Sequence, residues 1–168
     1  MGLIALICWL SLRPSRPEFH IHHFTIVGLG QADGFESTRI VFNVSVRNPN
    51  RRLRISYESL SASVYYGGER IGSTPSLYSF DQPPENTSYV HHVLTGGVMA
   101  GNYGQPWMEI VSDRAQGMVD FRLELRSTIR YEKAILDLKR HRLRPKCNAP
   151  VGPDGLLLPD YRDKRCSL

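Results

Sequence analysis

The sequence predicts an all-β protein, a β-sandwich of the immunoglobulin or fibronectin-III-like type with about seven strands and one short helix. Three observations favour this fold class. Apolar and polar residues alternate with a period of two in several segments. The 14 glycines and 11 prolines suggest many turns. Apolar residues make up 41% of the 168-residue chain, enough for one core, and this composition excludes an intrinsically disordered or collagen-like protein.

In the first half of the chain, period-two segments predict strands over residues 40–46, 60–66 and 88–94. The first of these strands is half-buried and stops at the turn signal Asn48-Pro49-Asn50. After the second, Gly67-Gly68 predicts a tight hairpin into residues 69–72. Residues 79–86 contain Pro83-Pro84, and we expect them to form a loop.

The second half begins with the expected helix, near Pro106 to Ala115, with Pro106 in its first turn and Gly117 after its end. Its apolar face would consist of Trp107, Ile110 and Val111 and would cap one end of the sheets. The cleanest alternation in the chain follows over residues 119–131 and predicts a long strand. A last strand is expected near residues 135–144.

The first residues suggest a membrane anchor. Residues 2–12 are apolar and uncharged, but a spanning helix needs about 20 such residues. The arginines follow this stretch, whereas a secretory signal carries its positive charges before the apolar segment. We interpret residues 1–17 as a partial membrane anchor with its juxtamembrane linker, and residues 18–168 as the folded domain. The alternative is a buried first strand or helix.

Cysteines and glycosylation sequons favour an oxidising compartment. Cys147 and Cys166 lie in a tail rich in Pro, Gly and Asp, and a disulfide is their simplest use; a nucleophilic Cys147 is the alternative. Sequons begin at Asn43 and Asn86, and the alternation places Asn43 on the solvent face of its strand. Together with the anchor, these features predict a domain that faces the lumen or the cell exterior.

Signals for catalysis or cofactors are weak. His20 and His22 share a strand face and could chelate a metal, but no third ligand follows at a defined spacing, so surface histidines are the expectation. Gly28-Leu29-Gly30 lacks the next glycine of a dinucleotide loop. There is neither a Gly-x-Ser-x-Gly elbow nor an evident carboxylate pair. We therefore expect no enzyme, no metal site and no cofactor.

Basic residues cluster near the end of the chain, whose formal net charge is +5. The run consists of Lys139, Arg140, Arg142, Arg144 and Lys146. It is either a solvated strand face, which is the more common case, or a contact for anionic lipid, phosphate or wall polyanions. No aromatic platform or recognition helix accompanies it, so a nucleic-acid partner is not expected.

Residues 43–50, Asn-Val-Ser-Val-Arg-Asn-Pro-Asn, are similar to a strand and turn of a plant family, the proteins related to non-race-specific disease-resistance and harpin-induced proteins (NHL proteins). Further segments also resemble this family: the hairpin 65–72, the proline loop 80–87, the strand 117–131 and the tail 147–166. The resemblance implies a late-embryogenesis-abundant group-two β-sandwich with a short helix. It also implies a cysteine-closed tail and a single pass through the plasma membrane, with no catalytic residues.

From these observations we expect a non-enzymatic, membrane-anchored protein of plant defence or stress response whose domain faces the cell exterior. Its partner would be a protein or cell-wall component, contacted by the basic strand or by the Pro83-Pro84 loop. The alternative is an intracellular stress protectant of the late-embryogenesis type, soluble or lipid-contacting.

Overall fold

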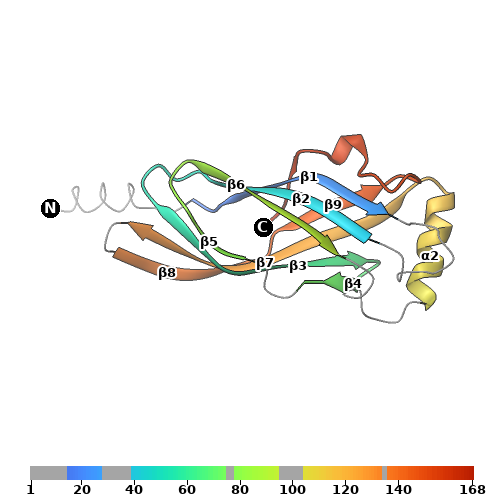
Figure 1. Ribbon diagram of the computed structural model, residues 1–168, viewed down its shortest axis with the longest axis horizontal. Coiled ribbons are helices and arrows are strands. Elements are labelled where there is room, and N and C mark those ends of the chain that lie inside the picture. Colours follow the sequence, from blue (N-terminus) through green and yellow to red (C-terminus); the bar gives the residue numbers. More distant parts are fainter. Residues whose placement is uncertain (1–14, 28–38, 75–77, 95–103, 134–135) are drawn as a thin grey trace.

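The computed structural model describes residues 15–27, 39–74, 78–94, 104–133 and 136–168, which form two antiparallel sheets packed against each other (Figure 1). Sheet A contains, in spatial order, β10 (Lys164–Arg165), β1 (Glu18–Val27), β2 (Arg39–Asn48) and β6 (Asn86–Leu94). Sheet B is built on β3 (Arg54–Tyr66) and β7 (Val119–Lys133), which pair with each other. Strands β4 (Glu69–Ser73) and β5 (Tyr78–Gln82) also pair with β3, and β8 (Leu136–Leu143) and β9 (Lys146–Val151) with β7. The expected all-β sandwich is confirmed.

The core lies between the two sheets because the strands direct alternate residues inward. On β2 the inward residues are Ile40, Phe42, Val44 and Val46, all fully buried. Phe24 of sheet A meets Phe121 of sheet B, with 6.0 Å between the ring centroids. The period of two in the sequence therefore marks the sandwich interior correctly.

The loop expected over residues 79–86 is partly wrong, because β5 extends to Gln82 and pairs with β3. Side-chain packing explains the strand: Phe80 stacks on Tyr57 with 4.4 Å between centroids. Gln82 is fully buried and accepts a hydrogen bond from the Tyr57 hydroxyl at 2.7 Å. The turn is confined to the residues around Pro83-Pro84, between β5 and β6.

The single strand expected near residues 135–144 ends at Leu143, and a separate strand, β9, follows it. β8 lies beside residues 127–133 of β7, and β9 beside residues 119–124. Arg144-Pro145 separates the two strands without a change of register along β7, and the Pro145 carbonyl accepts a hydrogen bond from Leu125 N–H at 3.0 Å. Proline has no N–H to donate to a continuing ladder. The basic run therefore crosses from one strand to the next.

Helix α2 (Gly104–Ala115) lies across one end of the sandwich, as expected (Figure 1). Ile110 is fully buried, whereas Val111 is 38% exposed, so the expected apolar face is wrong at Val111. The Trp107 side chain lies outside the described residues. The helix is fastened at its last turn, where the Tyr66 hydroxyl donates a hydrogen bond to the Asp113 carboxylate. Gly117, at φ +106°, follows its end as predicted.

The Asn-Pro-Asn turn is held by the buried side chain of Asn48. Its Nδ2 donates to the carbonyl oxygens of Leu53 at 2.8 Å and Pro83 at 3.1 Å. Its Oδ1 accepts from the backbone N–H of Asn50 at 3.0 Å. A buried amide is stable only with such partners, so this asparagine joins the ends of β2, β3 and β5.

Candidate anion-binding surface

The basic run lies at the outer edge of sheet B. Arg140, Arg142, Arg144 and Lys146 all have exposed side chains, while the side chain of Lys139 lies outside the described residues. Arg140 is paired with Arg130, and Arg142 with Thr128 of β7. Directly opposed residues of neighbouring strands point to the same face of a sheet. Arg140 and Arg142 therefore share the solvent face of sheet B with alternate residues of β7.

Among the described side chains of the basic run, those of Arg140 and Lys146 lie close to glutamates. Arg140 Nη2 lies 3.6 Å from Glu58 Oε1, and Lys146 Nζ lies 3.7 Å from Glu124 Oε1. Neither Arg142 nor Arg144 forms an ion pair with any carboxylate in the part of the chain that the structure describes. Among the described side chains of the run, the uncompensated positive charge is therefore at Arg142 and Arg144.

Arg126 of β7 belongs to the same group, although the sequence analysis did not single it out. Ser127 is paired with Leu143, so Arg126 and Arg144, the residues on either side of that pair, lie next to each other. Arg126 likewise forms no ion pair within the described ranges. The alternation of residues 119–131 marks Arg126 as solvent-facing, but only the strand pairing places it beside the basic run.

Arg126, Arg142 and Arg144 surround a hollow of about 140 Å³, which we call the outer hollow. Ser59 and Thr128 add hydroxyl groups to its wall, and its lining residues include no acid. Ser59 lies at φ +54°, where the register between β3 and β7 shifts. This β-bulge brings a hydroxyl into the arginine group.

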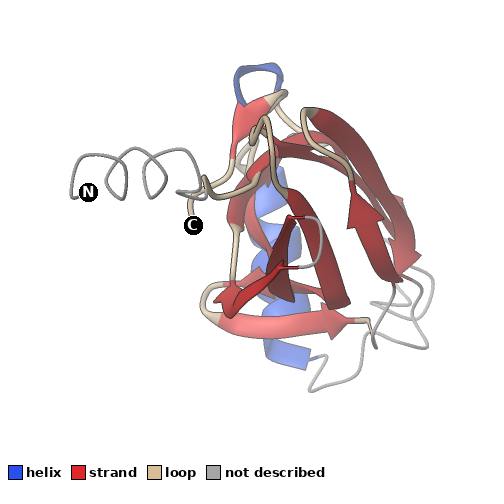
Figure 2. Cartoon of the chain, turned by 90° about the vertical axis from the view of Figure 1, so that its left-hand side faces the viewer, coloured by secondary structure: helices blue, strands red, loops and turns tan. Residues whose placement is uncertain are grey.

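A second hollow, of about 240 Å³, shares the wall formed by Arg142 and Arg144, and we call it the edge hollow. Arg16, Tyr131 and His141 also line it, together with Leu143 and Leu168. The Tyr131 hydroxyl donates to the Ser15 carbonyl at 3.3 Å, and burial raises the pKa of this hydroxyl above its ordinary value. Figure 2 views the domain from the side opposite helix α2, which lies behind the strands.

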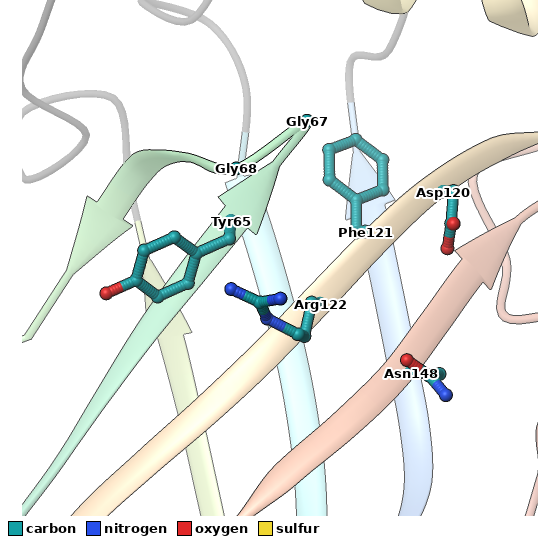
Figure 3. Close-up of a pocket in the computed structure, with 7 residues that line it drawn as sticks. All are labelled: Tyr65, Gly67, Gly68, Asp120, Phe121, Arg122 and Asn148. Atoms are coloured by element: carbon teal, nitrogen blue, oxygen red, sulfur yellow. The ribbon is translucent and has the colours of Figure 1, made fainter.

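A third hollow, of about 210 Å³, lies near the start of β7 and beside the Gly67-Gly68 hairpin (Figure 3). The Arg122 guanidinium lies 5.0 Å from the centroid of the Tyr65 ring and 3.9 Å from the Glu124 carboxylate. Asp120 also lines this hollow. Because acids accompany its only arginine, this hollow is not part of the uncompensated basic surface.

Comparison with known families identifies the domain. The family model LEA_2, described as late embryogenesis abundant protein, matches residues 43–149. The chain belongs to the LEA_2 family. NDR1/HIN1-like protein 10 of Arabidopsis thaliana is 31% identical over 95% of this chain and 68% of its own length. NDR1/HIN1-like protein 3 and Protein NDR1, also of Arabidopsis thaliana, are 28% and 25% identical over 90% and 92% of the chain.

The expected resemblance to NHL proteins is thereby confirmed. The chain spans 66% of NDR1/HIN1-like protein 3 and 72% of Protein NDR1. Among solved structures, a protein from Archaeoglobus fulgidus aligns over 81% of this chain and 95% of its own, with 12% identity and a TM-score of 0.41.

The LEA_2 match contains most of the basic surface. Arg126, Arg142 and Arg144 lie within residues 43–149, as does Cys147. Arg16 and Cys166 lie outside it. The outer hollow is thus built on the LEA_2 match alone, whereas the edge hollow also uses a residue that precedes it.

The expected membrane anchor lies almost wholly outside the described residues, which begin at Ser15. Within the ranges that the structure describes, no helix has the length and apolar character needed to cross a membrane.

In this LEA_2 domain a disulfide joins Cys147 of β9 to Cys166, which follows β10. Both cysteines are buried. The Cys166 N–H donates to the Phe19 carbonyl of β1 at 2.7 Å. The bond thus links sheet B to the tail strand that extends sheet A.

The two sequons lie in different settings. Asn86 is exposed at the start of β6. Asn43 is half-buried in the central part of β2, on the outer face of sheet A as predicted, and its Oδ1 is buried without a hydrogen-bond partner. Asn86 is therefore the more accessible of the two in the folded domain.

His22 links Asp163 and Ser45, a connection that the sequence did not predict. His22 Nδ1 lies 2.5 Å from Asp163 Oδ1, and Nε2 lies 2.7 Å from Ser45 Oγ. The hydrogen bond from His22 lowers the pKa of Asp163. This is the order of a catalytic triad, but a serine nucleophile also needs a substrate cavity and oxyanion donors. Ser45 is 6% exposed and lines none of the three hollows, so we assign the chain of bonds to holding the tail against sheet A.

No group of three or more metal-ligating side chains occurs among the described residues, and His20 lies with His22 on β1 without forming such a group.

Proposed function

We propose that this chain is the folded part of a membrane-anchored, non-enzymatic plant protein of the defence or stress response. Family membership supports the proposal, since the chain contains a LEA_2 domain and resembles proteins named NDR1 and NDR1/HIN1-like. We further propose that the domain faces the cell exterior and binds an anionic partner, on a protein or a wall or membrane component.

One observation supports the anionic partner most directly: Arg126, Arg142 and Arg144 stand together without a carboxylate partner among the described residues. Elsewhere on sheet B, Glu58 and Glu124 compensate neighbouring basic residues. Like charges held side by side repel one another. A bound anion would remove this repulsion, and it would strengthen the domain that binds it.

The exterior location is supported by two features. A disulfide persists in oxidising compartments and is rare in the cytosol of mesophiles, and the structure pairs Cys147 with Cys166. The sequon at Asn86 is exposed, which suits a glycan on the folded surface.

Gel mobility of the full-length protein expressed in plant cells tests the location. We expect a faster band after glycosidase and an altered band after reductant. The variant N86Q should lose most of the glycosidase shift, with N43Q as the matched comparison. If neither treatment moves the band and both tail cysteines react as free thiols, the domain is cytosolic, and the intracellular protectant becomes the better description.

Charge reversal tests the partner. The variant R126E/R142E/R144E should lose retention at the cell surface after the anchor is released by protease, because the uncompensated group is inverted. A matched triple variant, R51E/R70E/R162E, changes the net charge equally at exposed positions on other segments. Equal retention of both variants, each folded, would disprove the role of the basic surface.

A further inference from the structure

We propose that the outer hollow and the edge hollow bind the phosphate groups of phospholipid headgroups, so that this end of the domain rests on the membrane surface. The inference rests on the proposed function, because it identifies the anionic partner of the same basic surface. Three observations support it: which residues line the two hollows, the volumes of the hollows, and the point at which the N-terminal segment meets the domain.

The lining of the outer hollow matches the chemistry of phosphate recognition. Guanidinium groups present a planar fork of N–H donors that pairs with two phosphate oxygens at once. Arg126, Arg142 and Arg144 supply three such forks, and Ser59 and Thr128 supply hydroxyl donors. A phosphate accepts from all of these groups, and the lining contains no carboxylate to repel it.

The size of the hollows favours a compact group over an extended chain. About 10–15 Å³ on this measure of cavity volume holds one water molecule, so a hollow of about 140 Å³ has room for a group the size of a phosphate. The two hollows lie on either side of Arg142 and Arg144. Two separate binding sites can each hold one of two neighbouring headgroups, whereas an acidic polysaccharide would need a continuous groove.

The entry point of the chain places the hollows near a membrane. The Asn50 side chain forms two hydrogen bonds with the Ser15 backbone, at 2.8 Å and 2.9 Å. Arg16, the next residue, lines the edge hollow. The described chain thus begins beside the edge hollow, and the apolar residues 2–12 precede this point in the sequence. If that segment enters a membrane, Arg16, Arg142 and Arg144 lie at headgroup level, where arginine is favoured.

Vesicle flotation of the full chain provides the test. The vesicles contain phosphatidylcholine with or without phosphatidylserine, and polygalacturonate in solution serves as the wall polyanion. Inorganic phosphate, followed by NMR shifts of the arginine Nε–H signals, reports on free phosphate. All variants keep the apolar segment 2–12, so its contribution to binding cancels in the comparison.

The variant R142E/R144E should bind phosphatidylserine-containing vesicles at least about 30-fold more weakly, because each basic residue near an anionic surface contributes about a factor of five and the two glutamates add repulsion. The control R70E/R162E carries the same change of net charge and should bind as the unmodified chain does. A second variant, R142K/R144K, preserves the charge and removes the guanidinium forks. It should bind more weakly than the unmodified chain, and inorganic phosphate should no longer shift the Arg126 signal.

Three outcomes would overturn the inference. If R142E/R144E and R70E/R162E bind vesicles equally, the hollows do not contact headgroups. If R142K/R144K binds as the unmodified chain does, the attraction is a diffuse electrostatic one and neither hollow is a phosphate-binding site. R142K/R144K also provides the test if charge reversal prevents folding. If R142E/R144E loses polygalacturonate binding alone, the partner is a wall polyanion. In that last case the proposed function stands. If the gel-mobility test instead shows that the domain is cytosolic, the proposed function is refuted, but the vesicle result is unaffected.

Discussion

The side chain of Asn50 pairs with the backbone of Ser15 as a neighbouring strand would. Asn50 Oδ1 accepts from Ser15 N–H at 2.8 Å, and Asn50 Nδ2 donates to the Ser15 carbonyl at 2.9 Å. The same amide nitrogen also donates to Asn48 Oδ1 at 2.9 Å. The Asn-Pro-Asn turn therefore does more than end β2: it fixes the direction from which the N-terminal segment reaches the sandwich.

We predict that N50A weakens this attachment. A neutral hydrogen bond contributes about 1 kcal/mol, so the free energy of unfolding should fall by about 1–3 kcal/mol. Hydrogen exchange measured by mass spectrometry should accelerate first in the peptide that contains Ser15. The exposed neighbour Arg51 gives the control, R51A, which should leave that peptide unchanged; equal exchange in both variants would contradict the finding.

The tail packs tightly against β1 at Gly155. Gly155 has φ +81°, and a Cβ built there would lie 2.2 Å from the Ile26 carbonyl oxygen. The Ile26 N–H also donates to the Gly155 carbonyl at 2.8 Å. G155A should therefore lower the unfolding free energy by at least about 2 kcal/mol more than G67A.

Gly67 is the suitable control because it also has a positive φ, +58°, but its Cβ would meet nothing within 4 Å. Thermal or denaturant unfolding of both variants provides the measurement. If the two alanine variants have the same stability, the close approach of the tail to β1 does not exist in solution.

Removal of the disulfide should destabilise the domain. Cys147 and Cys166 close a loop with a sequence separation of 19, and the chain-entropy description gives about 3 kcal/mol for a loop of this length. The double variant C147S/C166S should lose this amount in denaturant unfolding and should no longer respond to reductant. The control C8S retains both tail cysteines, and its stability should still fall when reductant is added.

Acid should weaken the attachment of the tail through Asp163. The hydrogen bond from His22 lowers the pKa of Asp163 below its ordinary value of 3.8. A carboxyl group with a lowered pKa in the folded state stabilises the fold above its unfolded pKa, and this contribution is lost as the pH falls through the folded value. D163N should therefore flatten the fall in unfolding midpoint below about pH 4.

The exposed Asp160 lies in the short 3₁₀-helix η2 (Pro159–Tyr161), outside this chain of hydrogen bonds. The control D160N should leave the acid dependence of the unfolding midpoint unchanged. If D160N and D163N give the same pH profile, the contact between His22 and Asp163 contributes nothing in solution.

Particular residues show where prediction from the sequence succeeds and where it fails. The alternation of residues 40–46 predicts β2, because one face of that strand meets the core and the other meets solvent. The prolines at 83 and 84 suggest a loop from residue 79, but Phe80 stacks on Tyr57, which is distant in the sequence. Tertiary packing therefore overrides the local signal as far as Gln82.

The candidate site divides in the same way. Arg140, Arg142, Arg144 and Lys146 are evident as a run of positive charge, but Glu58 and Glu124 remove two of them from the uncompensated group. Arg126 and Arg16 join the group from other segments. No local pattern could reveal either change, because ion pairs and hollows depend on which strands become neighbours.

The sequence by itself determined the fold class and the existence of a basic run, because these follow from periodicity, turn residues and composition along the chain, and the resemblance of residues 43–50 and later segments to NHL proteins indicated the family. The tertiary structure decided which of the basic residues remain without a carboxylate, and where the N-terminal segment joins the domain. It also decided that His22 holds Asp163 and Ser45 together. The physical reason is that charge compensation and hydrogen bonding act over a few ångströms in space, between residues that are far apart in the sequence.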